Sequence, residues 1–200
     1  MSLLTLYDFP LSGNCYKVRL LLAMLELPYQ RIRIDSTTPT ATQTPEFRRI
    51  NPRGQIPVLV DGDSTIWDSM AILVYLARRE QRTDWLPNDA RGEARIMQWL
   101  AVSENELLYG LARARATKRF DRPFNLAQCQ QEAHAGLKTL NLQLEQSPWL
   151  CGETATIADV ACYPYVHLAP EADVSLDEYP AVREWVARIE TLPNWVPIDA

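Results

Sequence analysis

The chain has 200 residues, of which 47% are hydrophobic and 22% charged, and its formal net charge is −5 at pH 7. This composition is typical of a globular protein with one large domain or two small ones, and it excludes the disordered and fibrous classes. The acidic balance disfavours nucleic acid as a partner. The chain has only two histidines, and its four cysteines lie far apart in the sequence, which excludes zinc-ribbon and multi-histidine metal sites.

The N-terminus lacks the features of a secretory signal peptide. It has no basic segment, and Asp8, Pro10 and Gly13 soon interrupt its apolar residues. No stretch approaches the ~18 consecutive apolar residues that a membrane span needs. We therefore expect a cytoplasmic protein without membrane association, whose cysteines are reduced thiols.

The first half of the chain alternates between strand and helix patterns. The apolar run at 3–7 predicts a short buried strand, which the turn-forming Pro10 closes. Apolar residues then recur at helical spacing from about Asn14 to Glu26 and predict a helix, which Pro28 ends.

Three more strands and a helix complete this half. Alternating residues at 29–34 predict a half-buried strand, and the Thr-rich segment 35–46 is expected to form a loop. Strand patterns at 57–60 and 64–67 flank a short turn-forming segment and predict a hairpin. Helical spacing returns at 70–76. The order β-α-β-(α)-β-β-α is that of a small layered α/β domain.

The pattern changes after residue 79. Residues 80–89 are mainly polar and predict a linker, and residues 90–200 show helical spacing interrupted by prolines, with no strand pattern of any length. The charge divides at the same place, with nine basic and eight acidic residues up to residue 80 and eleven and seventeen after it. We expect an α/β domain at 1–79 and an acidic, all-helical domain at 90–200.

The turn after the first strand is a candidate anion site. A strand that leads through a turn into a helix directs backbone N–H groups and the positive end of the helix at one point in space. Ser12 offers a hydroxyl donor there, Gly13 allows close approach of the backbone, and Asn14 offers an amide. Ser12 or Asn14 could instead simply cap the helix.

The spacing Ser12-x-x-Cys15 resembles a C-x-x-C redox motif whose first cysteine has become serine. We expect Cys15 to be a buried helix residue and not a nucleophile, because apolar burial raises the pKa of a thiol. The protein would then bind a reactive thiol without supplying one. Nearby, Lys17 is expected to be a solvated charge on the helix surface.

Four segments, taken in order, resemble the cytosolic glutathione transferases. They are FPLSGNCYKVR at 9–19, NPRGQIPVL at 51–59, DSMAI at 68–72 and TATIADVACY at 154–163. The serine in the first segment is typical of the theta-, zeta- and phi-like branches of the family, and the chain resembles their bacterial members. The resemblance covers the whole chain. It implies an α/β + all-α fold with a thioredoxin-like first domain, and glutathione as a cosubstrate with no metal.

The resemblance also implies how glutathione is bound. Ile56 and Pro57 look like the family's cis-proline corner, which exposes the backbone of Ile56 to the cysteinyl part of glutathione. Gln55 matches a position that flanks this contact. Asp68 and Ser69 match the pair that holds the γ-glutamyl end, and both could also begin the next helix.

A weaker match concerns Gln43, which falls where plant-type relatives hold the glycyl carboxylate.

For the sulfur, the resemblance implies a hydroxyl donor at Ser12, with Asn14 as the second candidate. Lowering the pKa of a free thiol from about 8.5 by two units needs about 2.7 kcal/mol. One hydrogen bond to the charged sulfur contributes ~1.5–3 kcal/mol and a helix N-terminus ~0.3–1 kcal/mol. Tyr7, by contrast, is interpreted as strand packing.

The helical domain is expected to contribute the electrophile pocket, between the two halves. Tyr109, Arg113 and Phe120 are candidates by position only, and bundle packing is the alternative. The same stretch carries a basic cluster of five residues: Arg113, Arg115, Lys118, Arg119 and Arg122. This cluster is either a solvated helix face or a site for an acidic electrophile. Thr156 and Asp159 resemble the family's helix-capping box.

Three kinds of function follow from the resemblance. The leading one is a glutathione transferase that activates bound glutathione for attack on a small electrophile, in the manner of a detoxification enzyme. The second is a glutathione-dependent disulfide reductase or peroxidase, or a zeta-like isomerase. A non-enzymatic interaction protein of the same fold is disfavoured by the intact set of glutathione-binding residues. A homodimer is expected from the resemblance alone.

Overall fold

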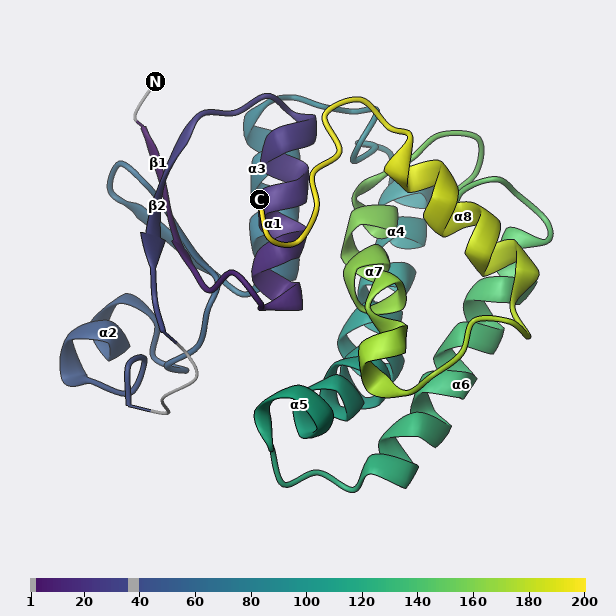
Figure 1. The fold of residues 1–200 in the computed structure, drawn as a ribbon. Coiled ribbons are helices and arrows are strands. Elements are labelled where there is room, and N and C mark those ends of the chain that lie inside the picture. Colours follow the sequence, from purple (N-terminus) through teal and green to yellow (C-terminus); the bar gives the residue numbers. More distant parts are fainter. Residues whose placement is uncertain (1–2, 36–39) are drawn as a thin grey trace. The chain divides into compact units, whose positions relative to one another are not determined.

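The computed structural model describes residues 3–35 and 40–200 (Figure 1). Its first-half elements are β1 (Leu4–Asp8), α1 (Gly13–Met24), β2 (Tyr29–Arg33), α2 (Pro45–Ile50), β3 (Val58–Asp61), β4 (Ser64–Trp67) and α3 (Ser69–Arg79). The remaining elements are α4 (Ala90–Val102), η1 (Ser103–Ala112), α5 (Arg113–Phe120), α6 (Leu126–Leu144), α7 (Ile157–His167), η2 (Ala169–Ala172) and α8 (Pro180–Glu190). The loop expected at 35–46 lies partly outside the described residues, and the rest of it includes the beginning of α2.

The chain forms two compact units. The first contains residues 1–80 together with 193–200, and the second contains residues 81–192. The expected α/β and all-helical grouping is confirmed, but the last eight residues pack with the first unit. The structure puts no helix or strand in 80–89, where a linker was expected. Two of its residues, Trp85 and Leu86, are nevertheless buried, and the carbonyl of Trp85 accepts a hydrogen bond from the N–H of Ile157.

The first unit is built on a four-stranded sheet with the order β2-β1-β3-β4. β1 and β2 are parallel, whereas β3 is antiparallel to both β1 and β4. Leu4 and Leu6 of β1 are buried, and α1 and α3 lie side by side as a layer beside the sheet (Figure 1). This arrangement confirms the predicted βαβαββα order of a thioredoxin-like domain.

The strand register gathers three loops at one edge of this sheet. Val58 of β3 lies opposite Tyr7 of β1 on one side and opposite Trp67 of β4 on the other. Because β3 runs antiparallel to both neighbours, the residues after β1, before β3 and after β4 all leave the sheet at the same end. The helices α1 and α3 begin at this end as well.

The second unit contains helices and the loops between them, and its described residues form no strand apart from an isolated bridge between Trp149 and Gly152. α4, η1 and α5 follow one another without a break, and η1 is a π-helical segment, a rare form that is frequently found at functional sites. α7 begins with the predicted capping box, in which Thr156 and Asp159 bond each other's backbone N–H groups. Trp185 is fully buried, and its Nε1–H donates to Asp159 over 2.9 Å.

A close helix contact in this unit depends on glycine. A Cβ atom added at Gly110 of η1 would lie 2.4 Å from the backbone nitrogen of Ala133 in α6. Because backbone atoms cannot move aside, we expect Gly110→Ala to lower the free energy of unfolding by about 1–3 kcal/mol, measured by urea denaturation. Gly136→Ala is the matched control. Its Cβ would meet side-chain atoms of Glu106 and Leu107 at 3.0 Å, so a change below about 1 kcal/mol is expected, since alanine also favours the helix. Equal losses in both variants would contradict this account.

None of the helices within residues 3–35 and 40–200 is both long and apolar enough to cross a membrane. The same residues contain no group of three or more histidine, cysteine, aspartate or glutamate side chains placed to hold a metal ion.

Candidate functional site

The candidate site lies where the three loops leave the sheet of the first unit. It is formed by the turn before α1, the segment before β3 and the start of α3. Each of these segments carries residues that the sequence singled out. The structure therefore brings to one end of one sheet residues that are more than 40 positions apart in the chain.

Ser12 is the N-cap of α1. Its backbone is extended (φ −77°, ψ 122°), and its Oγ accepts a hydrogen bond from the N–H of Cys15 over 3.2 Å. The capping alternative is therefore confirmed. It does not exclude the functional one, because the cap uses a lone pair of Oγ and leaves the hydroxyl proton available to another acceptor. The side chain is only half-buried, so a ligand can reach it.

Asn14 lies in the first turn of α1 and is half-buried. Its Oδ1 atom is buried and has no hydrogen-bond partner among the described residues. Buried amide groups in proteins are rarely left unpaired, and an unpaired one calls for an explanation such as a ligand. The structure therefore keeps both Ser12 and Asn14 as candidate contacts for a bound group.

Cys15 is fully buried, which confirms its interpretation as a helix residue. Burial, reinforced by the neighbouring carboxylate of Asp8, raises the pKa of its thiol to about 12. At neutral pH the thiol therefore stays protonated, and a protonated thiol is a poor nucleophile.

We expect Cys15 to resist alkylation by iodoacetamide in the folded protein up to about pH 9 and to react once urea unfolds it, because unfolding returns its pKa to the ordinary value of about 8.5. Mass spectrometry of the peptide that contains Cys15 measures this. Cys151, which is only partly buried, is an internal reference and should be modified first, although burial also raises its pKa, to about 11. Rapid modification of Cys15 in the native state would contradict the account.

The peptide bond between Ile56 and Pro57 is cis, as predicted. The backbone N–H and C=O groups of Ile56 make no hydrogen bond within the described part of the chain. An extended backbone with unpaired groups at a sheet end can pair with a ligand as a strand would. Asn51, which the sequence analysis did not single out, is buried and holds this segment through a 2.7 Å bond from its Nδ2 to the carbonyl of Gln55.

Gln43 lies against the same segment. Its Nε2 donates to the carbonyl of Gly54 over 2.8 Å, and its Oε1 accepts from Arg48. Gly54 has a φ of +60°, and a Cβ there would lie 2.7 Å from the Gln43 side chain, so glycine is required for this approach. The structure thus places Gln43 against Gly54, the residue before the exposed Gln55.

Asp68 and Ser69 begin α3. Asp68 has a φ of +79°, which is uncommon for a residue other than glycine and is a form of strain that clusters at functional sites. Its Oδ1 accepts from the N–H of Met70 over 3.0 Å, so the capping role is confirmed. Its Oδ2 forms an ion pair with Arg53 over 3.1 Å, which the sequence analysis did not predict. Ser69 is buried, and no side-chain hydrogen bond ties it to another described residue.

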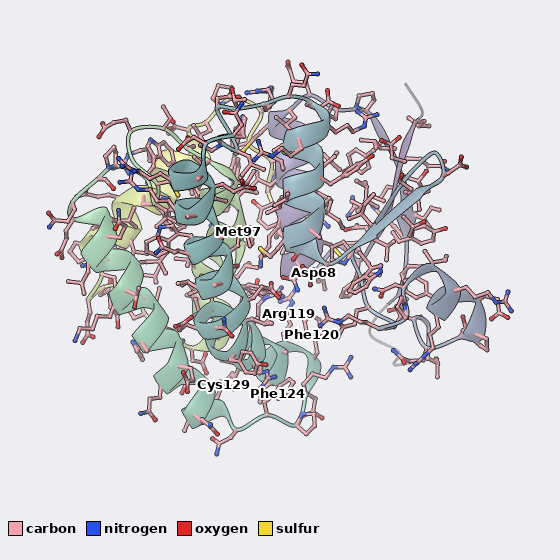
Figure 2. All side chains as sticks on the ribbon, turned by 180° about the vertical axis from the view of Figure 1, so that it is seen from behind. Asp68, Met97, Arg119, Phe120, Phe124 and Cys129 are labelled. Carbon is pink, nitrogen blue, oxygen red and sulfur yellow. The ribbon has the colours of Figure 1, made fainter. Side chains whose placement is uncertain are left out.

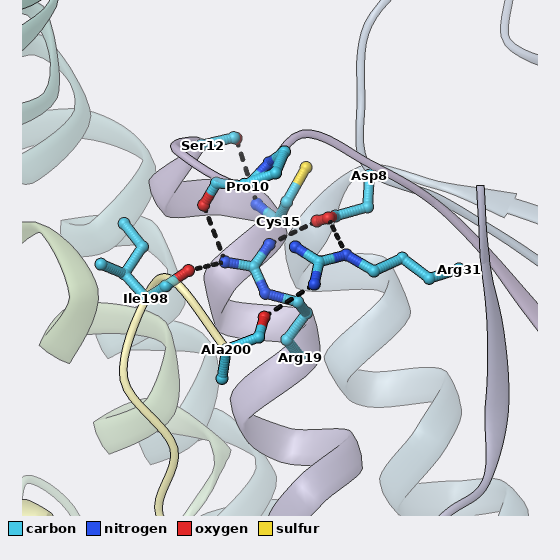
Figure 3. Close-up of polar contacts among 8 residues, drawn as sticks. All are labelled: Asp8, Pro10, Ser12, Cys15, Arg19, Arg31, Ile198 and Ala200. Atoms are coloured by element: carbon cyan, nitrogen blue, oxygen red, sulfur yellow. Dashed lines mark hydrogen bonds and ion pairs between the residues drawn. The ribbon is translucent and has the colours of Figure 1, made fainter. Parts of the chain in front are cut away.

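A buried charge cluster lies directly beneath the Ser12 turn (Figure 3). Asp8 is completely buried, and its two carboxylate oxygens are each paired with an arginine, Arg19 and Arg31. Sequence analysis missed this cluster. The signal was that Asp8 continues the buried phase of Leu4 and Leu6 in β1.

One expectation on α1 is wrong. Lys17 is fully buried and not a solvated surface charge. Ten of the twelve residues of α1 are buried, so the helix has no broad solvent-facing side. The spacing of its apolar residues did not reveal this, because periodicity identifies the side facing the sheet and not what covers the other side.

In the second unit, two of the three electrophile candidates line a pocket of about 540 Å³ between η1, α5 and α6. The guanidinium of Arg113 contacts the rings of both Tyr109 and Phe124, with 3.8 and 5.0 Å from its central carbon to the two ring centroids. Figure 2 shows Phe124 and Cys129, two of the other lining residues. Phe120 is not part of the lining and instead contacts Arg115.

The basic cluster around this pocket is not simply a solvated helix face. Arg115 is buried and pairs with Glu171 over 2.7 Å, and Arg119 approaches the same carboxylate at 3.5 Å. Lys118 pairs with Asp173 over 2.6 Å. These cations thus tie α5 to η2 and the residue after it.

Comparison with known proteins gives matches over almost the whole chain. The glutathione S-transferase N-terminal domain matches residues 2–78, and the glutathione S-transferase C-terminal domain matches residues 112–188. The chain is 33% identical to the disulfide-bond oxidoreductase YfcG of Escherichia coli K12 over 204 residues, covering 96% of this chain and 92% of YfcG.

Solved structures agree with these sequence matches. A crystal structure of a glutathione S-transferase from Pseudomonas fluorescens Pf-5 has a TM-score of 0.92 at 33% identity, with 98% of this chain and 99% of that chain covered. Another structure from Pf-5, of a glutathione transferase family member with two glutathione bound, has a TM-score of 0.85 at 27% identity and covers 96% and 90% of the two chains.

Proposed function

The chain belongs to the glutathione S-transferase family, and on this premise we propose that it binds glutathione at the sheet end of its first unit and activates the thiol. The carrying observation is the unpaired backbone of Ile56 at the same sheet end as the Ser12 turn and the start of α3. A peptide-like ligand needs such a backbone edge, and an anionic sulfur and a carboxylate need donors and helix N-termini.

In this proposal each part of glutathione has its own contacts. The cysteinyl part pairs with the backbone of Ile56. The γ-glutamyl carboxylate lies at the N-terminus of α3 with the Ser69 hydroxyl, and its ammonium is attracted by Asp68. Gln55 flanks the cysteinyl contact, and Gln43 holds the glycyl end, which is consistent with the contact of Gln43 with Gly54.

The chemical step is the formation of a thiolate. The glutathione thiol releases its proton to solvent, and the hydroxyl of Ser12 donates to the remaining anion, assisted by the N-terminus of α1. The sulfur lone pair then attacks the electrophile, a carbon–sulfur bond forms, and the leaving group departs with the electrons of its own bond. Tyr109 and Arg113 of the second-unit pocket are the proposed contacts of the electrophile, and the cation of Arg113 favours an anionic one. Phe120, expected as a third contact, does not line this pocket and is not proposed as one.

Disulfide reduction is the second candidate, and the likeness to YfcG together with the burial of Cys15 favours it. A glutathione thiolate would attack one sulfur of a disulfide, giving a mixed disulfide and one released thiolate. A second glutathione thiolate would attack the mixed disulfide, giving oxidised glutathione and the other thiolate. Both electrons come from the two glutathione molecules, so no protein thiol is needed.

One set of measurements separates these candidates. Calorimetry tests glutathione binding, conjugation of an aryl halide tests transfer, and turnover of a small disulfide with glutathione tests reduction. We expect binding together with at least one of the two activities. Reduction that survives Cys15→Ala, without conjugation of any electrophile, would establish the second candidate over the first. Failure to bind glutathione would favour an interaction protein of the same fold.

The remaining proposals concern the setting of the protein. We propose that it works in the cytoplasm as a homodimer, with a role in detoxification if transfer is its activity. Analytical ultracentrifugation of the purified protein tests the dimer, and a sedimentation coefficient of a monomer at micromolar concentration would exclude it.

A further inference from the structure

The last residues of the chain are bound to the rest of the first unit by three hydrogen bonds to their backbone carbonyls, and Figure 3 shows those to Ile198 and Ala200. The hydroxyl of Tyr16 donates to the carbonyl of Val196 over 2.7 Å. Arg19 donates to the carbonyl of Ile198 over 2.5 Å, and Arg31 to that of Ala200 over 2.7 Å. The donors come from α1 and β2, more than 160 residues earlier in the chain.

The same Arg19 also holds the turn that carries Ser12. Its NH2 group donates to the carbonyl of Pro10 over 2.9 Å as well as to Ile198, and its NH1 group donates to Asp8 at the end of β1. Asp8 and Pro10 lie on the stretch of chain that leads from the strand into α1. The guanidinium of Arg19 therefore links the C-terminal segment to two residues of this short stretch, Asp8 and Pro10.

The position of the Arg19 side chain depends on its burial. Its side chain is 2% exposed and that of Asp8 is 0% exposed. The attraction between the two charges and the strength of their hydrogen bonds are greatest where water is excluded. If the C-terminal segment left, water would reach the guanidinium, and the Ile198 carbonyl would no longer fix its NH2 group against Pro10.

We propose that residues 196–200 act as a clasp that fixes Arg19, and that Arg19 in turn positions the Ser12 hydroxyl for the bound thiol. Arg19 is a positioning residue and touches no substrate. The part of the proposal that concerns the thiol rests on the proposed function, whereas the link between the clasp and the turn does not.

The test uses full-length variants. In the first, residues 196–200 are replaced by alternating glycine and serine, which removes the apolar side chains and makes docking of the segment entropically costly. The second is Tyr16→Phe, which removes the hydrogen bond to Val196 and keeps the aromatic ring. Tyr163→Phe is the matched control, because Tyr163 is equally buried and its hydroxyl also donates a hydrogen bond, to Glu190 of the second unit.

The first readout needs no glutathione. It is hydrogen–deuterium exchange of the amides of Ser12, Cys15 and Tyr16, which bond to Phe9 and Ser12 within the turn. We expect exchange to be about tenfold faster in the glycine–serine variant and about threefold faster in Tyr16→Phe, with no change in Tyr163→Phe. Unchanged exchange in both the glycine–serine variant and Tyr16→Phe would overturn the proposal that residues 196–200 hold the turn, even if thermal stability fell. Should the glycine–serine variant not fold, Tyr16→Phe decides the test alone.

The second readout is the pH midpoint of thiolate formation by bound glutathione, followed by ultraviolet absorbance. We expect this midpoint to rise by about one pH unit in the glycine–serine variant, because a mobile Ser12 stabilises the thiolate less. Faster exchange with an unshifted midpoint would overturn the positioning role of Arg19. If the unaltered protein forms no glutathione thiolate, the proposed function fails, and the exchange rates still decide whether the clasp holds the turn.

Discussion

Ser12→Ala is expected to lower kcat/KM for glutathione conjugation, or for disulfide reduction if that is the activity, about 10- to 150-fold. The reason is the loss of a hydrogen bond to an anionic sulfur, which stabilises the thiolate by ~1.5–3 kcal/mol. Glutathione should still bind, since the contacts of Ile56, Asp68 and Ser69 are unchanged. Steady-state kinetics and the pH midpoint of the bound thiolate, which should move upward, measure the effect.

The same change removes the cap of α1, at a cost of about 1 kcal/mol in stability. Two further variants separate the roles. Ser12→Thr keeps both the cap and the hydroxyl and should stay close to the native activity. Ser12→Asp keeps the cap acceptor but places a negative charge beside the sulfur, so stability should be retained while activity falls at least as far as in Ser12→Ala.

Asn14→Ala distinguishes the two candidate donors. If Ser12 is the donor, this variant should lose activity by less than about tenfold, because the Asn14 amide would then make only a secondary contact. A large loss in Asn14→Ala together with a nearly normal Ser12→Ala would transfer the role of thiolate donor to Asn14.

Asp8→Asn is expected to lower the free energy of unfolding by about 3–5 kcal/mol, measured by urea denaturation followed by circular dichroism. The change keeps the shape of the side chain but removes the anion that pairs with both Arg19 and Arg31, and a buried charge left without its partner is strongly destabilising. The loss should be accompanied by faster amide exchange in the Ser12 turn, since Arg19 also holds Pro10.

Asp84→Asn is the matched control for this prediction. Asp84 pairs with Arg82 through well-formed hydrogen bonds, but the Asp84 side chain is 58% exposed and that of Arg82 is 38% exposed. The hydrogen bonds from Arg82 lower the pKa of Asp84, so its contribution is present at neutral pH and is lost as the pH falls below the usual aspartate range. Exposed pairs contribute less than about 1 kcal/mol. Similar losses for Asp8→Asn and Asp84→Asn would show that burial of the Asp8 cluster does not strengthen it.

Much of the fold could be read from local patterns. The strand at 29–34 and the hairpin at 57–67 were placed within about one residue of β2, β3 and β4, because alternation of apolar residues and turn-forming residues act over short distances. The cis bond before Pro57 could be predicted because the segment around it resembles that of a known family.

The candidate site was harder to predict at the points where charges are buried. Asp8, Lys17 and Arg19 are types of residue that are rarely buried without partners, and so Lys17 was expected in solvent. Arg53 was not singled out because its partner, Asp68, is fifteen residues away and meets it only through the pairing of β3 with β4.

The sequence by itself determined the order of the elements, the division into an α/β and a helical half and the cis-proline segment, and it offered the caps of α1 and α3 as alternatives that the structure then showed. Each of these depends on residues within a few positions of one another, or on a segment long enough to resemble a family. Only the tertiary structure decided that 193–200 pack with the first unit and that Arg19 joins Asp8, Pro10 and Ile198. Those contacts join residues up to 180 positions apart, and they depend on the exclusion of water, which no local pattern records.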